Sequence, residues 1–482
     1  MFLQEMGQVR ELFHDHIGSL VGVGMTAFSR IIPACFLNSY HMVTFSRTAD
    51  LPLLRKMADI FCLEEEGGAL PNSGRNSASL LSHRLTRDYL SRLPGPITLS
   101  LYQNYPDLEA LANEEGWHLL ANPATLRLRL RERAFFQQMA ADLGLDQIRG
   151  AILPISVLRE RCYEDWVGDL GPELVFQLTD MAQGGGRGTF FIRSRQAYNT
   201  LRDHLKGDTW RDVPLTSILV RQFVKGTPAS VAICITRQGI LISGLQKQLI
   251  DLPYCANSVE NGIFCGHVWD ENPWDAAVRE VATTQAEKIG KYVAALGYRG
   301  ILGIDFVIDE TAGQAYPLEI NPRFTGAFPM LSLLHLQNGI IPLDAFHLIE
   351  FLNIPCQMDV AELNRRYQTP LKGSHLLLFF PPDRQQVRGF RLQAGLYEVG
   401  PDDHAVRFVG DGTGYADIRN ENQFIVVDGP PLSSTGEGTS GDPFSRLCHL
   451  LFSCPVSNAK GALSPHTRII LKWIYGMDNG AS

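Results

Sequence analysis

Alternating apolar and polar side chains mark residues 301–323 as a pair of short strands. The stretch reads ILGIDFVIDETAGQAYPLEINPR, and its polar middle predicts a turn at 309–314 between strands at 301–308 and 315–321. Because successive side chains of a strand point to opposite faces, one face is apolar and comprises Ile304, Phe306, Ile308, Leu318 and Ile320. The other face carries Asp305, Glu319, Asn321 and Arg323. A hairpin centred near Ala312 places Asp305 opposite Glu319, and Gly303 opposite Asn321.

The polar face of this hairpin predicts a metal site. Two carboxylates that face each other across a ladder repel, and a cation between them removes the repulsion. Two carboxylates and an amide suit a hard ion such as Mg²⁺, and Arg323 at the end of the row would reach a phosphate oxygen. A solvated acidic face on an ordinary hairpin has the same pattern, so the hairpin alone leaves both interpretations open.

Strand-like and helix-like runs alternate near the N-terminus, which predicts a parallel α/β sheet. The strand at 18–25 is followed by a helical stretch to residue 36 and a second strand at 41–47. Gly22, Gly24 and Ala27 fit a relaxed GxGxxA dinucleotide motif. The second strand ends in Arg47 instead of the acid that holds a ribose. Either Arg47 accommodates the 2′-phosphate of NADP, or the glycines only form a tight turn.

Glycines gather at residues 183–189, QGGGRGT, between apolar runs at 174–178 and 190–193. This strand–loop–strand unit lacks the Lys-Ser/Thr of a Walker motif and the spacing of GxGxxG. Glycines let backbone N–H groups curl around an anion, and Arg187 adds positive charge. The loop is therefore predicted to cradle phosphates, with a flexible hairpin loop as the alternative. Lys247 and Gln248, on a later strand, face either the substrate or solvent.

Two helices complete this picture. The first is predicted at 128–143, with Arg133 near its start and a domain boundary just before it. The second, at 272–297, delivers the chain into the acidic hairpin. Short strands follow residue 372. The predicted fold class is α/β and α+β.

Composition narrows the class of protein. The chain has 482 residues, 45% of them hydrophobic and 20% charged, which suits a globular protein of about three domains. A net charge of -8 without a basic tract argues against a nucleic-acid partner. Apolar runs fall short of the roughly 20 residues of a membrane span, and the N-terminus lacks the apolar core of a signal peptide. Nine cysteines without a CxxC pair favour reduced thiols, so we expect a cytoplasmic protein.

The order of these motifs resembles the ATP-grasp superfamily. The resemblance is carried by the glycine loop at 183–189, by VRQFVKG at 220–226, and by GIDFVI…YPLEINPR at 303–323. It implies a Rossmann-like domain over 1–125, an ATP-grasp domain of two subdomains over 126–355, and a C-terminal α+β region over 356–482.

The resemblance also implies roles for single residues. Asp305, Glu319 and Asn321 would bind Mg²⁺ or Mn²⁺, and Arg323 would be the catalytic contact to the reacting phosphoryl group. The loop residues Gly184, Gly185, Gly186, Arg187 and Gly188 would cover the β- and γ-phosphates of ATP. The backbone of Gln222, Phe223 and Val224 would hold the adenine.

Two lysines that such proteins usually carry are replaced in this chain. Gln177 stands on the strand before the glycine loop, and Arg133 stands at the start of the domain. Arg133 keeps a positive charge, as a planar fork, whereas Gln177 offers only a hydrogen bond.

The function that the resemblance implies is ATP-dependent ligation of a carboxylate to an amine through an acyl phosphate, with release of ADP and phosphate. Similar proteins of about this length act on amino acids and peptides, so the expected partners are small acids and amines. The sequence leaves the oligomeric state open, with a homodimer as one option. Two alternatives remain: a degenerate ATP-grasp protein that binds nucleotide without ligase activity, which Gln177 favours, and an NADP-dependent oxidoreductase that uses Gly22 and Gly24.

Overall fold

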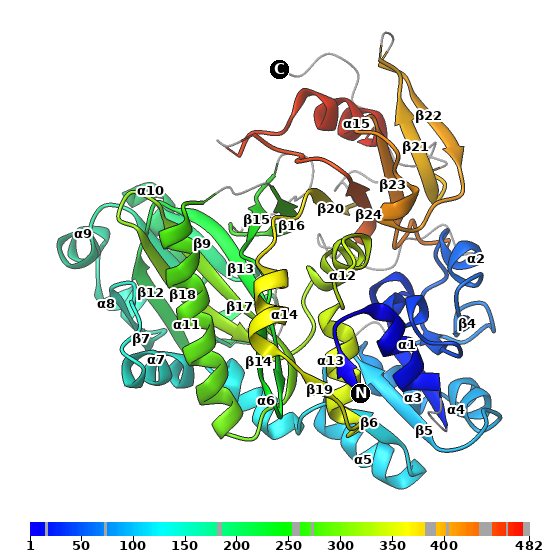
Figure 1. The fold of residues 1–482 in the computed structure, drawn as a ribbon. Helices are drawn as coiled ribbons and strands as arrows, with labels where there is room; N and C mark the ends of the chain where they lie inside the picture. The colour runs from blue at the N-terminus through cyan, green and yellow to red at the C-terminus, as the bar shows by residue number, and fades with distance from the viewer. Residues whose placement is uncertain are drawn as a thin grey trace.

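The computed structural model describes residues 1–475 without the segments 15–17, 72–74, 181–185, 253–260, 271–273, 381–391, 402–403, 433–445 and 459–460. Three large sheets and the helices between them make up the chain (Figure 1). This mixture confirms the predicted fold class. Among the described helices, none combines the length and the apolar composition that a membrane-spanning helix requires. The eight cysteines that the structure describes are all free thiols.

The N-terminal sheet has five parallel strands in the order β4-β3-β2-β5-β6, as the alternation predicts. The strands are β2 (Ser19–Gly24), β3 (His41–Thr44), β4 (Asp59–Cys62), β5 (Ile97–Leu101) and β6 (His118–Leu120). The helices around them are α1 (Met6–His14), α2 (Leu51–Leu54), α3 (Ser77–Ser82), α4 (Arg84–Leu90) and α5 (Pro106–Glu115). Every residue of β2 and β5 is buried, as expected for strands covered on both faces.

The turn after β2 differs from the expected helical stretch. Two short 3₁₀ helices follow, η1 (Phe28–Arg30) and η2 (Ile32–Cys35), so no α-helix N-terminus is aimed at a pyrophosphate there. A Cβ at Gly22 would lie 2.0 Å from the Tyr40 hydroxyl oxygen, and one at Gly24 would lie 2.7 Å from the Thr26 carbonyl oxygen. Packing against these groups accounts for both glycines, in line with the tight-turn interpretation.

A four-stranded antiparallel sheet, in the order β7-β12-β8-β9, forms a lobe of its own. Its strands are β7 (Gly150–Pro154), β8 (Leu174–Leu178), β9 (Thr189–Ile192) and β12 (Ser217–Gln222). The helices α8 (Val157–Glu160), α9 (Tyr163–Leu170) and α10 (Arg195–His204) cover one face. On β8 the period of two puts Phe176 in this core and turns Val175 and Gln177 the other way, toward a cavity.

The largest sheet has eleven strands, in the order β18-β17-β13-β15-β16-β20-β24-β23-β21-β22, with β14 on β13. The first part is β13 (Thr227–Thr236), β14 (Gly239–Ile242), β15 (Gln246–Ile250), β16 (Phe264–Trp269), β17 (Gly300–Asp309) and β18 (Gln314–Asn321). The second part is β20 (Gly373–Phe379), β21 (Gly395–Val399), β22 (Val406–Gly410), β23 (Gln423–Val427) and β24 (Arg446–Phe452). The strands after residue 372 thus continue the central sheet.

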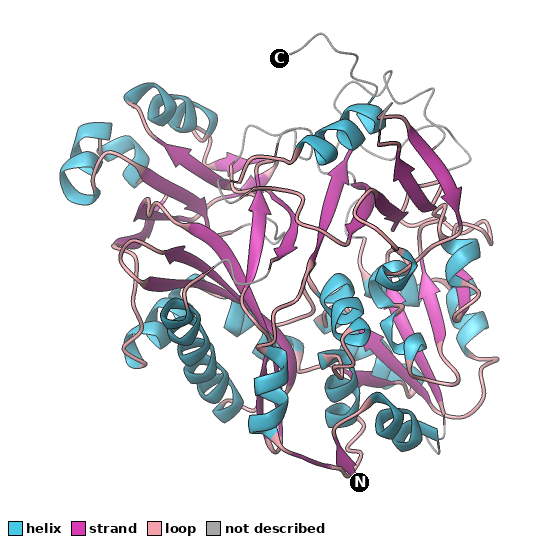
Figure 2. Ribbon diagram, turned by 45° about the horizontal axis from the view of Figure 1, so that its top comes forward, coloured by secondary structure: helices cyan, strands magenta, loops and turns pink. Residues whose placement is uncertain are grey.

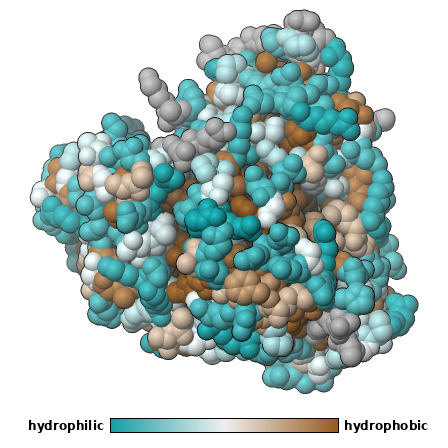
Figure 3. All heavy atoms as spheres, in the orientation of Figure 1, coloured by the Kyte–Doolittle hydropathy of each residue, from teal (hydrophilic) through white to brown (hydrophobic). Residues whose placement is uncertain are grey.

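Helices cover both faces of this sheet. The long helix α11 (Ala276–Ala295) packs on β13, β14 and β18. The helices α12 (Phe328–Gln337) and α13 (Leu343–Phe351) lie between the N-terminal strands and the central strands (Figure 1), and α14 (Val360–Tyr367) and α15 (Pro465–Tyr475) follow. Figure 2 shows helices outside the strands at the left of the molecule. In Figure 3 the visible surface is mostly hydrophilic, and hydrophobic side chains gather mainly across its lower middle part.

The prediction of one continuous helix at 128–143 is wrong. The structure has two helices, α6 (Ala124–Arg131) and α7 (Arg133–Asp142), with Glu132 extended between them at φ -64° and ψ 126°. The break makes Arg133 the first residue of α7, while Phe136, Met139 and Ala140 enter the core beside the large sheet. Because the apolar period continues across Glu132, the sequence pattern could not show the change of direction.

The acidic hairpin is confirmed, with one correction. Asp305 pairs with Glu319, and Gly303 pairs with Asn321, as predicted. The register then shifts, so that Phe306 pairs with Pro317. This β-bulge brings Leu318 to the same side as Glu319, where it lines a cavity instead of joining the apolar face.

Candidate active site

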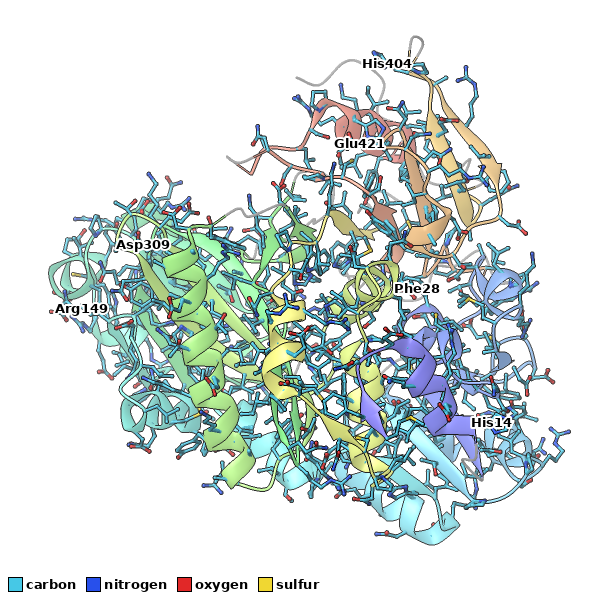
Figure 4. The ribbon with its side chains drawn as sticks, in the orientation of Figure 1. His14, Phe28, Arg149, Asp309, His404 and Glu421 are labelled. Atoms are coloured by element: carbon cyan, nitrogen blue, oxygen red, sulfur yellow. The ribbon has the colours of Figure 1, made fainter. Side chains whose placement is uncertain are left out.

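A cavity of about 1310 Å³ opens between the three large sheets. Its walls come from β8, β9 and β12, from β13, β15, β17 and β18, and from α6 with the segment that follows β5. The predicted site residues that line it are Arg133, Gln177, Gly186, Arg187, Gln222, Phe223, Val224, Asp305, Glu319, Asn321 and Arg323. Gly188 is not among the lining residues, and Gly184 and Gly185 lie outside the described residues. In Figure 4 the labelled Arg149, next to β7 of the four-stranded sheet, and Asp309, at the end of β17 of the large sheet, both lie at the left of the molecule.

The acidic row on β17 and β18 is tied together by hydrogen bonds. Asn321 Nδ2 donates to Asp305 Oδ2 at 2.7 Å and to Glu319 Oε1 at 3.4 Å. Gln248 Nε2 donates to Asp305 Oδ1 at 2.8 Å, so Gln248 faces the cavity, whereas its neighbour Lys247 is not among the lining residues. Arg133 forms an ion pair with Glu319. Five polar side chains, those of Asp305, Glu319, Asn321, Gln248 and Arg133, therefore converge on one spot.

Arg323 extends this row toward the N-terminal sheet. Its Nη2 donates to Asn321 Oδ1 at 3.0 Å and its Nη1 donates to the Phe324 carbonyl oxygen at 2.9 Å. Nη1 also donates to the hydroxyl of Tyr102, just after β5. These bonds hold the planar guanidinium beside the carboxylates, with the N-terminal sheet as one of its supports.

The two carboxyl groups differ in their affinity for a proton. Burial raises the pKa of Asp305, and the charge of Glu319 raises it further. Burial also acts to raise the pKa of Glu319, but the Arg133 guanidinium and the hydrogen bond with Asp305 outweigh it, so that the Glu319 pKa is lowered. The pair thus favours one negative charge instead of two.

This donor set fits a hard divalent cation. No group of three or more His, Cys, Asp or Glu side chains in the described part of the chain is arranged to hold a metal ion. A metal held by this row would therefore take the Asn321 amide oxygen as its third protein ligand, which requires the amide to turn its Oδ1 from Arg323 toward the two carboxylates. A cation between Asp305 and Glu319 would replace the proton that Asp305 otherwise keeps. Two carboxylates and an amide oxygen are the ligand types that Mg²⁺ accepts.

Arg221, which the sequence analysis missed, lies beside Gln177. Leu219 is the residue opposite Gln177 on β12, so Arg221 points to the same face one step along the strand. Its Nη2 donates to Gln177 Oε1 at 3.3 Å. Burial and, to a smaller extent, the charge of nearby Arg133 lower the pKa of Arg221 to about 10. A positive charge therefore stands next to the position where the usual lysine is missing.

The glycine loop reaches the opposite wall of the cavity. Gly186 has φ +83°, and a Cβ there would lie 1.9 Å from the Gly262 carbonyl oxygen. Asn261 joins the two walls: its N–H donates to the Thr189 carbonyl oxygen at 2.8 Å, and its Oδ1 accepts from the Phe191 N–H at 2.9 Å. The described end of the loop is thus fixed against residues 261–263, a contact that no local sequence signal indicated.

The connection from the four-stranded sheet to the large sheet runs through Gln222, Phe223 and Val224. The Gln222 N–H donates to the Arg149 carbonyl oxygen and the Phe223 N–H donates to the Glu173 carbonyl oxygen, both at 2.9 Å. The Phe223 ring meets the Phe191 ring edge-on, with centroids 5.4 Å apart. This connection forms an aromatic wall at the end of the cavity away from Arg323.

Comparison with known proteins agrees with this architecture. Residues 182–327 match the family model of the ATP-grasp domain. No curated protein matches the chain by sequence. The chain is similar in structure to the biotin carboxylase domain of 2-oxoglutarate carboxylase from Hydrogenobacter thermophilus, with a TM-score of 0.57 and 15% identity, over 91% of this chain and 87% of that one.

Two further solved structures have the same arrangement. N5-carboxyaminoimidazole ribonucleotide synthetase from Thermus thermophilus has a TM-score of 0.52 at 13% identity, over 96% of this chain and 100% of that one. Carboxyaminoimidazole ribonucleotide synthase from Aspergillus clavatus, solved with ATP, has a TM-score of 0.52 at 12% identity, over 95% and 99%. The chain therefore contains an ATP-grasp domain within an ATP-grasp fold, as the resemblance of its motifs predicts.

Proposed function

We propose that this protein is an ATP-dependent ligase that joins a carboxylate to an amine and releases ADP and phosphate. One observation carries the proposal: the row of Asp305, Glu319 and Asn321 stands beside Arg323 in one cavity with Arg133 and Arg221. A site for a hard cation, flanked by guanidinium groups, suits a triphosphate. Structures of similar fold, solved with ATP and with the magnesium salt of ADP, support a nucleotide in this cavity.

Different residues of the cavity would bind the metal, the phosphates and the adenine. Asp305, Glu319 and Asn321 would hold Mg²⁺, or Mn²⁺ by the same oxygen donors; when bound, the metal neutralises triphosphate charge and orients it for in-line transfer. Arg133 and Arg221 would bind phosphate oxygens. The Gln222 and Phe223 N–H groups are already used, so the adenine contacts fall to the Gln222 carbonyl and to Val224.

The chemistry follows from where charge develops. A carboxylate oxygen of the acid attacks the γ-phosphorus, the bond from that phosphorus to the ADP oxygen breaks, and an acyl phosphate forms. Arg323 stabilises the charge on the transferring group, together with N–H groups of the glycine loop, including that of Gly186. The amine nitrogen then attacks the acyl carbon, phosphate leaves, and the nitrogen loses a proton. Contact of the loop with residues 261–263 would keep water from the acyl phosphate.

The size of the cavity supports small substrates alongside the nucleotide. Its volume of about 1310 Å³ exceeds the roughly 300–1,000 Å³ of pockets for a single drug-sized ligand. We propose amino acids or short peptides as the acid and the amine. We also propose that the domains divide near residues 125 and 355, and that the protein acts in the cytoplasm as a homodimer, an assembly that the Hydrogenobacter structure also shows.

Neither alternative gains support from the described residues. The degenerate ATP-grasp alternative depended on Gln177, but Arg221 supplies a guanidinium beside it. The oxidoreductase alternative depended on Gly22 and Gly24, whose lack of a Cβ is explained by packing.

The proposal is tested by measuring ADP and phosphate release from MgATP with pools of amino acids and short peptides. We expect release in at least one pool, and a loss on the order of a hundredfold in Glu319→Gln, which removes one metal-binding charge. Glu310→Gln is the matched control, because Glu310 is an exposed residue of the same hairpin. AMP in place of ADP would contradict the acyl-phosphate route, and equal activity of Glu319→Gln would contradict the assigned site.

A further inference from the structure

A second group of cations lines the cavity beyond Arg323, on the eight-residue helix α6. Arg127 and Arg131 are one turn apart on the same helix face, and both line the cavity. Arg129 lies on a different face, exposed, with its guanidinium carbon 5.0 Å from the centre of the Phe135 ring. Like charges at a spacing of four residues destabilise a helix, so retaining both on the cavity side indicates a use for them.

Arg127 has an unusual environment. The residue is only 3% exposed, yet its Nε and Nη1 atoms are buried with no hydrogen-bond partner among the described residues. Its guanidinium carbon stands 5.3 Å from the centre of the Tyr105 ring. Burial lowers the pKa of Arg127, and the neighbouring charges of Arg131 and Arg323 lower it further. A buried guanidinium is favourable only when acceptors meet it, so its surroundings point to an anionic ligand.

Among the described residues, no carboxylate accepts a hydrogen bond from the Nε or Nη1 atom of Arg127. Glu319 is the one acid among the charged groups that act most strongly on Arg131, and Glu319 is ion-paired with Arg133. Arg323, the third cation, already donates to Asn321, to Tyr102 and to the Phe324 carbonyl. The guanidinium groups of Arg127, Arg131 and Arg323 therefore share one wall of the cavity, and the Nε and Nη1 atoms of Arg127 have no hydrogen-bond partner among the described residues.

The position of this wall separates it from the nucleotide. Arg127 stands over the Tyr105 ring and Arg323 donates to Tyr102, and both tyrosines follow β5 of the N-terminal sheet. Arg221 lies instead on β12, the strand that leads into Gln222–Val224. Arg127 and Arg131 thus line the N-terminal side of the cavity together with Arg323, where the acid substrate would be held for attack on the γ-phosphorus.

We propose that Arg127 and Arg131 bind a second anionic group of the acid substrate, a carboxylate or a phosphate, in addition to the carboxylate that is activated. This inference rests on the proposed ligase function and narrows its substrate class to dicarboxylic or phosphorylated acids. The planar fork of each arginine matches two oxygens of such a group. Tyr105 holds the Arg127 plane by ring contact.

The test measures binding, so it does not require turnover. Succinate and inorganic phosphate are titrated separately, by calorimetry, into the full chain saturated with MgADP. We expect at least one of the two probes to bind once per chain, and its affinity to fall about tenfold or more in Arg127→Gln and in Arg131→Gln. Arg129→Gln is the matched control on the same helix and is expected to bind as the unchanged protein does. The stronger probe identifies the carboxylate or the phosphate as the preferred group.

Three results would overturn the inference: no binding of either probe, an equal loss in Arg129→Gln, or a tenfold loss of MgATP affinity in Arg127→Gln, which would assign the arginine to the nucleotide. If Arg127→Gln lacks a cooperative thermal transition and so does not fold, the affinity of Arg131→Gln for the two probes tests the inference by itself. Failure of the ligase proposal looks different, because ADP release would be missing in every pool while the anion still binds and still depends on Arg127.

Discussion

At the residue scale, the unequal protonation of Asp305 and Glu319 links metal binding to pH. The folded protein keeps a proton on Asp305 that the unfolded chain releases once the pH exceeds its ordinary carboxyl pKa. The folded state then binds more protons than the unfolded state, so the contribution of Asp305 to stability falls as pH rises toward its raised folded pKa. Glu319 behaves in the opposite sense: its contribution is lost only as the pH falls through its lowered folded pKa.

The first prediction concerns this linkage. Without metal, the melting temperature of the unchanged protein should fall relative to that of Asp305→Asn as the pH rises from about 5 to 9, because asparagine carries no titrating proton. Mg²⁺ with ADP should raise the melting temperature of the unchanged protein increasingly over the same range. Thermal melts of both proteins, with and without Mg²⁺, provide the measurement. Parallel pH profiles for the two metal-free proteins would show that Asp305 does not hold the proton.

A second prediction concerns Arg221. Arg221→Gln should weaken MgATP binding about tenfold or more, because a charge-assisted contact to phosphate is lost. Adding Gln177→Lys should restore part of that affinity, since the new lysine returns a cation to the neighbouring strand. Calorimetric titration with MgATP measures both, with Arg195→Gln as a surface control on α10. Unchanged affinity in Arg221→Gln would exclude the role.

The predictable part of the site was local in sequence. Asp305, Glu319 and Asn321 lie on two strands joined by a short turn, so their pairing followed from the period of two alone. Gln248 was one of two candidates that faced either the substrate or solvent, and only the structure separates it from Lys247. Arg221 reaches the same cavity from β12, whose partners β7 and β8 come earlier in the chain and are separated from it by helices. Its sequence neighbourhood contains no signal of that pairing. Nor does a sequence show that an arginine such as Arg127 is buried without acceptors.

At the element scale, small departures from ideal strands and helices shape the cavity. The bulge in the hairpin turns Leu318 into the cavity beside Glu319, and the break at Glu132 sets Arg131 and Arg133 on separate helices. Both elements were expected, but neither irregularity was. Hydrophobic periodicity reports which face is buried, and an extra residue or a change of helix direction leaves that pattern nearly intact.

The glycine loop gives a third prediction. Gly186→Ala should lower MgATP affinity and ADP release about tenfold, because the new Cβ would meet the Gly262 carbonyl oxygen and push the loop from residues 261–263. Gly144→Ala is the control: its φ is +61°, but nothing lies within 4 Å of a Cβ there. Gly144→Ala has the strain of an alanine at positive φ but no contact between the new Cβ and a neighbouring atom. Its melting temperature should therefore change while its MgATP affinity stays the same. Equal loss of MgATP affinity in both variants would exclude a role for the loop contact.

At the scale of the whole molecule, one sheet unites the central and C-terminal parts of the chain. The strands after residue 372 join it at β16, through β20. The sequence predicted these strands but not their place, because pairing between distant strands depends on tertiary packing and has no local code. The parallel N-terminal sheet was easier to predict, since alternating strands and helices dictate it.

A fourth prediction tests which nucleotide the whole fold binds. A ligand that binds only the folded state increases the free energy of unfolding by mass action, and this raises the melting temperature. At a ligand concentration of a hundred times the dissociation constant, the increase is about 2.7 kcal/mol. MgATP should therefore stabilise the protein, and NADP should not, because the turn after β2 is filled by Tyr40 and Arg30. Thermal melts with each nucleotide provide the comparison. Stabilisation by NADP alone would favour the oxidoreductase alternative.

The most direct test of the central claim follows an oxygen atom. Acid substrates labelled with ¹⁸O in the carboxylate are incubated with the protein, MgATP and a pool of amines, and the masses of phosphate and products are measured. Ligation through an acyl phosphate predicts ADP, phosphate that carries one ¹⁸O, and a product lighter than the acid plus the amine by one water. Label in AMP, or ADP release with unlabelled phosphate, would contradict it.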